Sequence, residues 1–201
     1  MTSWDERYAG DDYLFGEAPN AFLARQAALL PATGRALAVA DGEGRNGVWL
    51  AQHGMNVDSV DGSVVAQRKA ARLAEKAGVT LNLILADMSD WPWPEAAYDV
   101  VAGIFIQFAG PSPRAKMFSG MRRALKPGGV MLIEGYGPRQ LEYRTGGPSD
   151  LASLYTEDLL RAEFGSFEII ELTSYDARLS EGSRHDGMSA LVDLVARKPV
   201  V

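Results

Sequence analysis

A short apolar segment that runs into a glycine-rich loop constrains the fold of this chain more than any other feature. Residues 36–40 are apolar, Asp41-Gly-Glu-Gly-Arg-Asn-Gly47 follows, and Val48-Trp-Leu-Ala51 resumes apolar periodicity. This order predicts a strand, a loop and a helix. The glycines at 42, 44 and 47 have the G-x-G-x-x-G spacing.

The glycine loop predicts a place where a ligand can approach the main chain. Gly42 and Gly44 permit tight backbone turns, and the helix that follows offers unpaired N–H groups and the positive end of its dipole. These properties suit a nucleotide-type cofactor. A strand-to-helix turn without a ligand has the same spacing, so the rest of the chain has to separate the two interpretations.

Composition excludes several functional classes. The 201 residues are 47% hydrophobic and 23% charged, with a net charge of −6 and no cysteine. The acidic balance argues against nucleic acid and anionic membranes as partners, and a chain without cysteine has no thiolate metal site. No apolar run is long enough to span a bilayer. We expect a cytoplasmic protein with no metal, either a monomer or a homodimer.

The remaining pattern predicts an α/β fold with one domain over residues 1–201. Helical stretches separate five apolar segments, as expected for a doubly wound parallel sheet with helices on both faces. Two further strands without a helix between them should pair antiparallel. The expected strands are 36–40, 57–60, 80–85, 98–105, 130–136, 167–178 and 188–196, and a helix is expected after Asn20.

Polar residues at the carboxyl ends of these strands mark candidate ligand contacts. Asp61 lies 17 positions after Gly44 and ends the second strand, where an acidic residue accepts hydrogen bonds from ribose hydroxyls. Its alternative role is that of a turn residue before Gly62. Gln107 follows the fourth strand, where doubly wound sheets open into a ligand crevice.

Two segments outside the repeating pattern are expected near the site. Residues 1–34 form an aromatic-rich leader and a helix, which could act as a lid on the cofactor or cover the edge of the core. Residues 137–150 form a polar insert after the fifth strand, near the expected substrate pocket.

Several motifs together resemble the class I S-adenosylmethionine-dependent methyltransferases. They are Gly42-Glu-Gly-Arg-Asn46, Asp61, Ala86-Asp-Met88 and Leu125-Lys-Pro-Gly-Gly129. The leader Trp4-Asp-Glu-Arg-Tyr8 and the tail with Glu181-Gly and His185 are similar to small bacterial tellurite-resistance-type methyltransferases. This resemblance implies a mostly parallel seven-stranded Rossmann-like sheet with a C-terminal antiparallel pair, S-adenosylmethionine as cofactor and S-adenosylhomocysteine as product.

The resemblance also implies roles for individual residues. The glycine loop would receive the amino acid part of the cofactor, Asp61 the ribose, Asp87 the adenine amino group, and Met88 would pack beside it. The implied cofactor residues are Ala40, Asp41, Gly42, Gly44, Arg45, Asn46, Asp61, Gly62, Asp87, Met88, Ile104 and Phe105. Family members commonly have an acidic residue and a glycine where this chain has Ala38 and Ala40, and we expect Ala40 to avoid positive φ.

The implied reaction is in-line transfer of the sulfonium methyl to a small-molecule acceptor such as a thiol or a chalcogen oxyanion. His185 is the candidate base, although a histidine in a strand-pair loop is also expected to be exposed. Candidate walls of the acceptor pocket are Tyr13, Phe15, Gln107, Tyr136, Arg139 and Tyr143. An NAD(P)-dependent oxidoreductase fits the glycine loop and Asp61 as well, and a cofactor-binding domain without catalysis is a third possibility.

Overall fold

The computed structural model describes residues 4–200 and places a seven-stranded sheet at their centre. The sheet has the order β3-β2-β1-β4-β5-β7-β6, with β7 antiparallel to both of its neighbours. The other neighbouring strands run parallel. The strands are β1 Gly34–Val39, β2 Met55–Asp61, β3 Leu81–Leu85, β4 Tyr98–Ile104, β5 Leu125–Tyr136, β6 Glu168–Glu181 and β7 His185–Arg197. The predicted fold class is therefore confirmed.

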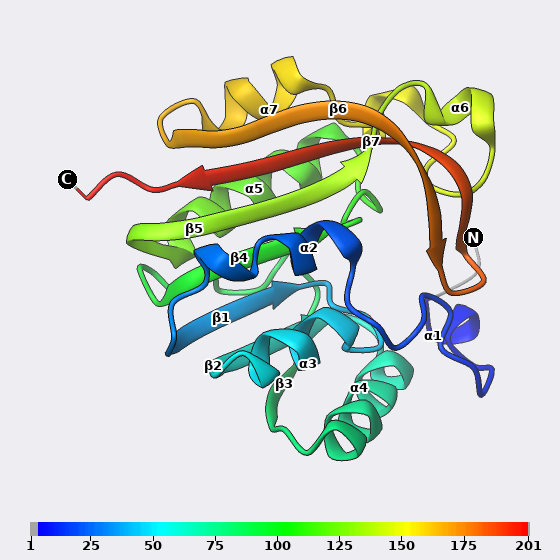
Figure 1. The fold of residues 1–201 in the computed structure, drawn as a ribbon, viewed down its shortest axis with the longest axis vertical. Helices are drawn as coiled ribbons and strands as arrows, with labels where there is room; N and C mark the ends of the chain where they lie inside the picture. Colours follow the sequence, from blue (N-terminus) through cyan, green and yellow to red (C-terminus); the bar gives the residue numbers. More distant parts are fainter. Residues whose placement is uncertain (1–3, 201) are drawn as a thin grey trace.

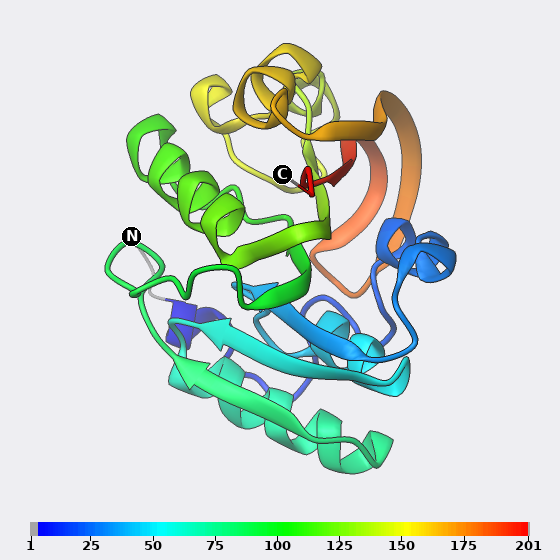
Figure 2. The ribbon, with the colours of Figure 1, turned by 90° about the vertical axis from the view of Figure 1, so that its left-hand side faces the viewer.

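Helices cover both faces of this sheet. Phe22, Leu23, Trp49 and Leu50 pack on one face, and Met117, Phe118, Leu160 and Phe164 pack on the other. Figure 2 shows α5 and α7 on one side of the strands and α2 on the other. The α-helices are α1 Trp4–Arg7, α2 Ala21–Arg25, α3 Arg45–Gln52, α4 Val64–Ala77, α5 Pro111–Ala124, α6 Gln140–Tyr143 and α7 Glu157–Phe164, and Ala27–Leu29 and Leu151–Ser153 are short 3-10 helices.

Local sequence fixes where the main helices begin. The side chains of Asn20, Ser63 and Thr156 accept hydrogen bonds from the first turns of α2, α4 and α7, as N-cap residues do. Gly78 ends α4 in the left-handed conformation, which glycine adopts without steric cost. The helix expected after Asn20 is shorter than its apolar spacing suggests, because it tightens into a 3-10 turn after Gln26.

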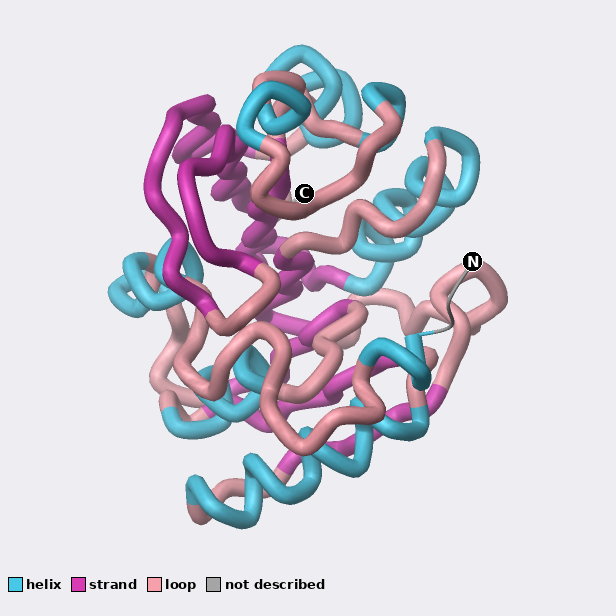
Figure 3. The backbone as a smooth tube through the Cα atoms, turned by 90° about the vertical axis from the view of Figure 1, so that its right-hand side faces the viewer, coloured by secondary structure: helices cyan, strands magenta, loops and turns pink. Residues whose placement is uncertain are grey.

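The β6–β7 hairpin is longer than the sequence predicts, and it shapes the site. Figure 1 shows both strands bending over the right-hand end of the sheet until the hairpin tip lies beside the N-terminal leader. The backbone N–H of Arg184 donates to the carbonyl oxygen of Leu14 at 3.2 Å. In Figure 3, which looks at the carboxyl ends of the parallel strands, the same hairpin tip meets the leader loops. Residues 1–3 of the predicted lid segment 1–34 lie outside the described range.

Candidate active site

The loop between β1 and α3 has the backbone geometry of a close ligand approach. Ala40, Gly42 and Gly44 have φ values of +47°, +58° and +90°. A Cβ on Gly42 would lie 2.8 Å from the hydroxyl oxygen of Tyr8, and one on Gly44 would lie 2.6 Å from the Cβ of Ala70. The expectation that Ala40 avoids positive φ is wrong, because the chain makes the same tight turn there with an alanine.

Asp41 stabilises this loop from inside. Its carboxylate accepts hydrogen bonds from the backbone N–H of Gly47 at 3.2 Å and from the hydroxyl of Ser59 at 2.8 Å. Burial raises the pKa of Asp41 to about 7. A Cβ at position 47 would lie 2.4 Å from Asp41 Oδ2, which explains the third glycine. The Asp41 side chain therefore already has partners within the protein.

Asp61 lies beside the glycine loop at the end of β2. It accepts hydrogen bonds from the backbone N–H groups of Gly42 and Ser63, both at 2.8 Å. Burial raises its pKa, although these hydrogen bonds oppose the rise. Each carboxylate oxygen keeps a second lone pair, so Asp61 can hold the loop and still accept from a ligand hydroxyl. Gly62 continues the turn into α4.

The ends of β3 and β4 flank those of β2 and β1 along the same edge of the sheet. Asp87 Oδ1 accepts hydrogen bonds from the backbone N–H and the hydroxyl of Ser89, which lower its pKa. Met88 is buried in the main core cluster. Ile104 is the last residue of β4, and Phe105 follows it with φ +55°. A phenylalanine in this region is strained, and such strain commonly occurs at functional sites.

The leader is attached to the glycine loop through a buried ion pair. Glu43 Oε1 lies 2.8 Å from Lys69 Nζ, and the two side chains are 2% and 3% exposed. Glu43 also accepts the backbone N–H of Leu14, while Lys69 donates to the carbonyl oxygen of Asp12. Tyr8 is buried against Gly42. These contacts place the leader over the glycine loop.

His185 lies in an aromatic enclosure at the carboxyl end of β4. Its ring centroid is 4.5 Å from that of Phe15, 4.3 Å from that of Phe105 and 5.8 Å from that of Tyr136. The expectation of an exposed loop histidine is wrong, since His185 is the first residue of β7 and is only 7% exposed. The hairpin continues beyond the predicted strand end and carries His185 inward.

The structure brings Phe15 and Tyr136 to His185, and the other predicted pocket residues have hydrogen-bond partners of their own. Tyr13 donates its hydroxyl to the carbonyl oxygen of Lys69. Gln107 is buried, and its amide bonds the main chain of Tyr136 and Ser153. Arg139 pairs with Asp176 and donates to the Tyr143 hydroxyl on the surface of α6.

The predicted insert contacts the enclosure from behind. A Cβ on Gly147 would lie 2.5 Å from the Tyr136 ring, so glycine there lets the insert pack flat on that ring. The insert therefore supports one wall of the enclosure through main-chain contact rather than through Arg139 or Tyr143.

Sequence reasoning missed a polar network that joins the leader, α3 and the hairpin. Glu181 Oε2 accepts a hydrogen bond from Arg45 Nη2 at 2.7 Å, and Asn20 bonds both Glu134 and Glu181. Asn46 Oδ1 accepts the backbone N–H of Asn20. A signal for such residues exists in the sequence, because Glu134 interrupts an apolar strand that is buried on both faces and must find partners there.

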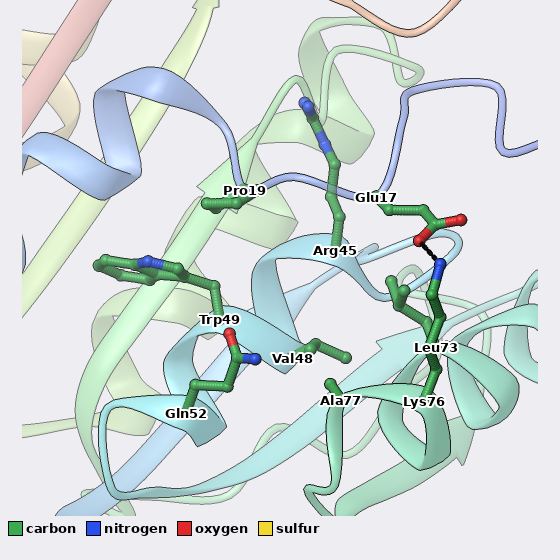
Figure 4. A pocket seen from close by; sticks show the side chains of 9 residues that line it. All are labelled: Glu17, Pro19, Arg45, Val48, Trp49, Gln52, Leu73, Lys76 and Ala77. Atoms are coloured by element: carbon green, nitrogen blue, oxygen red, sulfur yellow. Dashed lines mark hydrogen bonds and ion pairs between the residues drawn. The ribbon is translucent and has the colours of Figure 1, made fainter.

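A shallow cleft of about 210 Å³ lies between the leader and helices α3 and α4. Figure 4 shows Arg45 rising from α3 between Pro19 and Glu17, with Trp49 on one side and Lys76 on the other. The guanidinium Nη1 of Arg45 is buried and has no hydrogen-bond partner among residues 4–200. A buried donor in this state is a candidate ligand contact.

Comparison with known proteins identifies the domain. Residues 36–129, from β1 through the glycines before the apolar part of β5, match the family profile of a methyltransferase domain. Residues 36–129 are therefore similar to methyltransferase domains. Among curated proteins, none matches the sequence.

Solved structures resemble this chain over nearly its whole length. A structure described by the conversion of a disulfide bond into a thioacetal group in echinomycin biosynthesis has a TM-score of 0.78 at 19% identity, covering 98% of this chain and 91% of the other. An S-adenosylmethionine-dependent methyltransferase from Methanosarcina mazei has a TM-score of 0.72 at 17% identity, with 92% and 100% covered.

TehB from Haemophilus influenzae has a TM-score of 0.74 at 17% identity, and the match covers 97% of this chain and 65% of TehB. Identities this low establish a shared fold and no more. Among the helices of residues 4–200, none has the length and apolar composition needed to cross a lipid bilayer. The same residues contain no group of three or more His, Asp or Glu side chains that could hold a metal ion.

Proposed function

We propose that this methyltransferase transfers the sulfonium methyl of S-adenosylmethionine to a small-molecule acceptor beside His185. The observation that carries the proposal is the closed enclosure of Phe15, Phe105 and Tyr136 around that histidine. The leader and the hairpin tip meet over it through Leu14 and Arg184. A site covered in this way suits a small acceptor better than a macromolecular one.

The residues of the crevice fit the cofactor. Gly42 and Gly44 make a tight left-handed turn packed against Tyr8 and Ala70, and the main chain of this turn would receive the amino acid part. The unpartnered Nη1 of Arg45 suits the carboxylate of that part, with Asn46 on the same turn of α3. Asp61 would hold the ribose, Asp87 the adenine amino group, and Met88, Ile104 and Phe105 would pack along the cofactor.

The protein mainly aligns the reactants and excludes water. When bound, the cofactor supplies an activated methyl whose bond to sulfur breaks, with the electron pair left on sulfur, as the bond to the acceptor forms. Alignment of this kind is worth about 7–11 kcal/mol. His185 would take the proton of a neutral acceptor at Nε2, because its pKa is lowered by burial and the ring is therefore neutral near pH 7.

The acceptor class follows from what the enclosure offers. Aromatic walls favour an apolar or cationic acceptor body. An anionic acceptor such as a thiolate or a chalcogen oxyanion needs no base, whereas a phenol or a protonated thiol does. We propose a small nucleophile as the acceptor, with a thiol and a chalcogen oxyanion as the first classes to assay.

Thermal-shift titration tests the cofactor assignment. S-adenosylhomocysteine should stabilise the protein by RT ln(1 + [L]/Kd), while NAD should leave the melting temperature unchanged. Stabilisation by NAD instead would favour the oxidoreductase interpretation of the glycine loop. A methyl-release assay over thiol, chalcogen oxyanion, phenol and amine acceptors then tests catalysis, and no turnover on any of them would favour a binding domain.

The substitution Asp61→Asn tests the ribose contact. The amide oxygen can accept from only one of the two backbone N–H groups that Asp61 holds, and the charged acceptor is lost, so we expect S-adenosylhomocysteine to bind about 1–3 kcal/mol more weakly. Isothermal titration calorimetry measures this change. Asp150→Asn, which alters a carboxylate that caps only the 3-10 turn at residues 151–153, is the control. Unchanged affinity in Asp61→Asn would remove Asp61 from the binding site.

A further inference from the structure

Glu181 occupies a position between the cofactor loop and the candidate base. It is the last residue of β6, and its Oε1 accepts the backbone N–H of Ala21 at 2.9 Å. Its Oε2 accepts a hydrogen bond from Arg45 Nη2 at 2.7 Å and lies 3.9 Å from Nδ1 of His185. The side chains of Glu181, Arg45 and His185 are all at least nine-tenths buried. One carboxylate oxygen thus faces both a guanidinium and an imidazole.

The Nδ1 atom of His185 lacks the hydrogen-bond partner that this oxygen can supply. Nδ1 is buried and has no hydrogen-bond partner within the described part of the chain. Buried polar atoms in proteins are nearly always paired. Hydrogen bonds in active sites are also commonly long before ligands bind and shorten in the complex. A small closure of the 3.9 Å separation would satisfy Nδ1 with the oxygen that already faces it.

We propose that Glu181 is the positioning residue of His185. Glu181 accepts the Nδ1–H of the imidazole, which fixes the ring and leaves the lone pair on Nε2 for the proton of the acceptor. This inference rests on the proposed function, in which His185 is the base. When His185 takes that proton, both ring nitrogens carry hydrogen, and the Glu181 carboxylate stabilises the resulting imidazolium.

The positive charge of Arg45 explains why His185 stays neutral beside the Glu181 carboxylate before the reaction. Burial lowers the pKa of His185, Glu181 raises it, and the charge of Arg45 lowers it again. Burial alone would raise the pKa of Glu181, but His185, Arg45 and the N–H of Ala21 together lower it to about 2. Because the carboxylate is ionised and shared with Arg45, it can accept Nδ1–H while the imidazole remains neutral. Arg45, at the start of α3, is therefore linked to His185 through Glu181.

The tautomer of His185 tests this proposal without any need for turnover. The chain has only two histidines, so long-range ¹H–¹⁵N spectra of histidine-labelled protein with S-adenosylhomocysteine separate them easily. We expect the Nδ1–H tautomer for His185 in the wild type. We expect its loss in Glu181→Ala and its retention in Glu181→Gln, whose amide oxygen still accepts. His53, whose Nδ1 lies 2.8 Å from the Trp49 carbonyl oxygen, should not change in any variant.

The control variant is Glu168→Ala, which removes an exposed carboxylate from the other end of the same strand. The Nε2–H tautomer in the wild type would overturn the proposal, even if Glu181→Ala failed to fold. An unchanged tautomer in folded Glu181→Ala would overturn it equally. Normal turnover by His185→Asn on acceptors with a proton to lose would instead overturn the base, and hence the proposed function, whatever the tautomer shows.

Discussion

Ala40 occupies the left-handed region of the backbone at the first turn of the cofactor loop. An L-residue pays roughly 1–2 kcal/mol for this conformation, whereas glycine pays about 0.5–1 kcal/mol in chain entropy. We therefore expect Ala40→Gly to raise the free energy of unfolding by about 0.5–1 kcal/mol, as measured by urea denaturation. Ala38→Gly, in the extended backbone of β1, should lower it. Destabilisation by both substitutions would show that Ala40 does not have positive φ in solution.

Asp41 should give the protein a distinctive pH dependence. Burial raises its pKa in the folded state to about 7, so folding retains a proton that the unfolded chain loses near pH 4. Stability from this group is complete below pH 4 and is lost as the pH rises through 7, with a slope of at most about 1.4 kcal/mol per pH unit. Asp41→Asn should remove this component from melting curves measured between pH 4 and 8.

The effect of Asp41 has to be taken as the difference between the pH dependence of wild type and that of Asp41→Asn. Burial also raises the pKa values of Asp61, Glu134 and Asp193, which contribute to both curves. The exposed Asp158→Asn controls for the loss of one carboxylate. If the stability of wild type and of Asp41→Asn changed in parallel between pH 4 and 8, the raised pKa of Asp41 would be contradicted.

At the scale of elements, α4 makes two ion pairs with very different burial, one with Glu43 of the glycine loop and one with Glu17 of the leader. Lys69→Met leaves the Glu43 carboxylate buried without its cation, so we expect a loss of about 3–5 kcal/mol in the free energy of unfolding. Adding Glu43→Gln should recover most of that loss. The surface pair of Glu17 and Lys76, in which Lys76 is 68% exposed, is the matched control, and Lys76→Met should change stability by less than about 1 kcal/mol. Equal effects of the two lysine substitutions, measured by urea denaturation, would contradict the burial of Lys69.

The element order was predictable from the sequence because it depends on local periodicity. Alternating apolar strands and helices determine a doubly wound sheet, and the strand pair without a helix has to be antiparallel. Lys69 gives a further local signal, since it interrupts the apolar stripe of α4 between Ala66 and Ala70. A charged residue in such a stripe indicates a buried partner.

The aromatic enclosure could not be predicted in the same way. The polar residues between Ser180 and Arg184 resemble a surface loop, and the burial of His185 depends on Phe15 and Phe105 from distant parts of the chain. Likewise, Gln107 and Arg139 have side chains that suit a pocket, but non-local partners direct them elsewhere. Residue type identified candidates, and only tertiary packing could select among them.

At the scale of the whole molecule, the leader and the hairpin tip close the site at a glycine contact. Gly182 has φ +71°, and a Cβ there would lie 2.4 Å from both the Leu14 carbonyl oxygen and the Gly16 nitrogen. We expect Gly182→Ala to displace the leader, increase hydrogen exchange in residues 4–19 and weaken S-adenosylhomocysteine binding about 10-fold, as a loss of about 1.4 kcal/mol would do. Gly10→Ala, where a Cβ would meet no atom within 4 Å, should change neither quantity. Unaltered exchange in Gly182→Ala would show that this contact does not hold the leader.

The bond between Asn20 and Glu181 spans 161 positions of the chain, and this separation has a consequence during synthesis. A ribosome completes the glycine loop and the first five strands long before the hairpin tip leaves its exit tunnel. The nascent protein therefore has a crevice without its cover, and contacts of such high sequence separation form slowly. Exposure of the crevice on the translating ribosome ends only when the last strand joins the sheet.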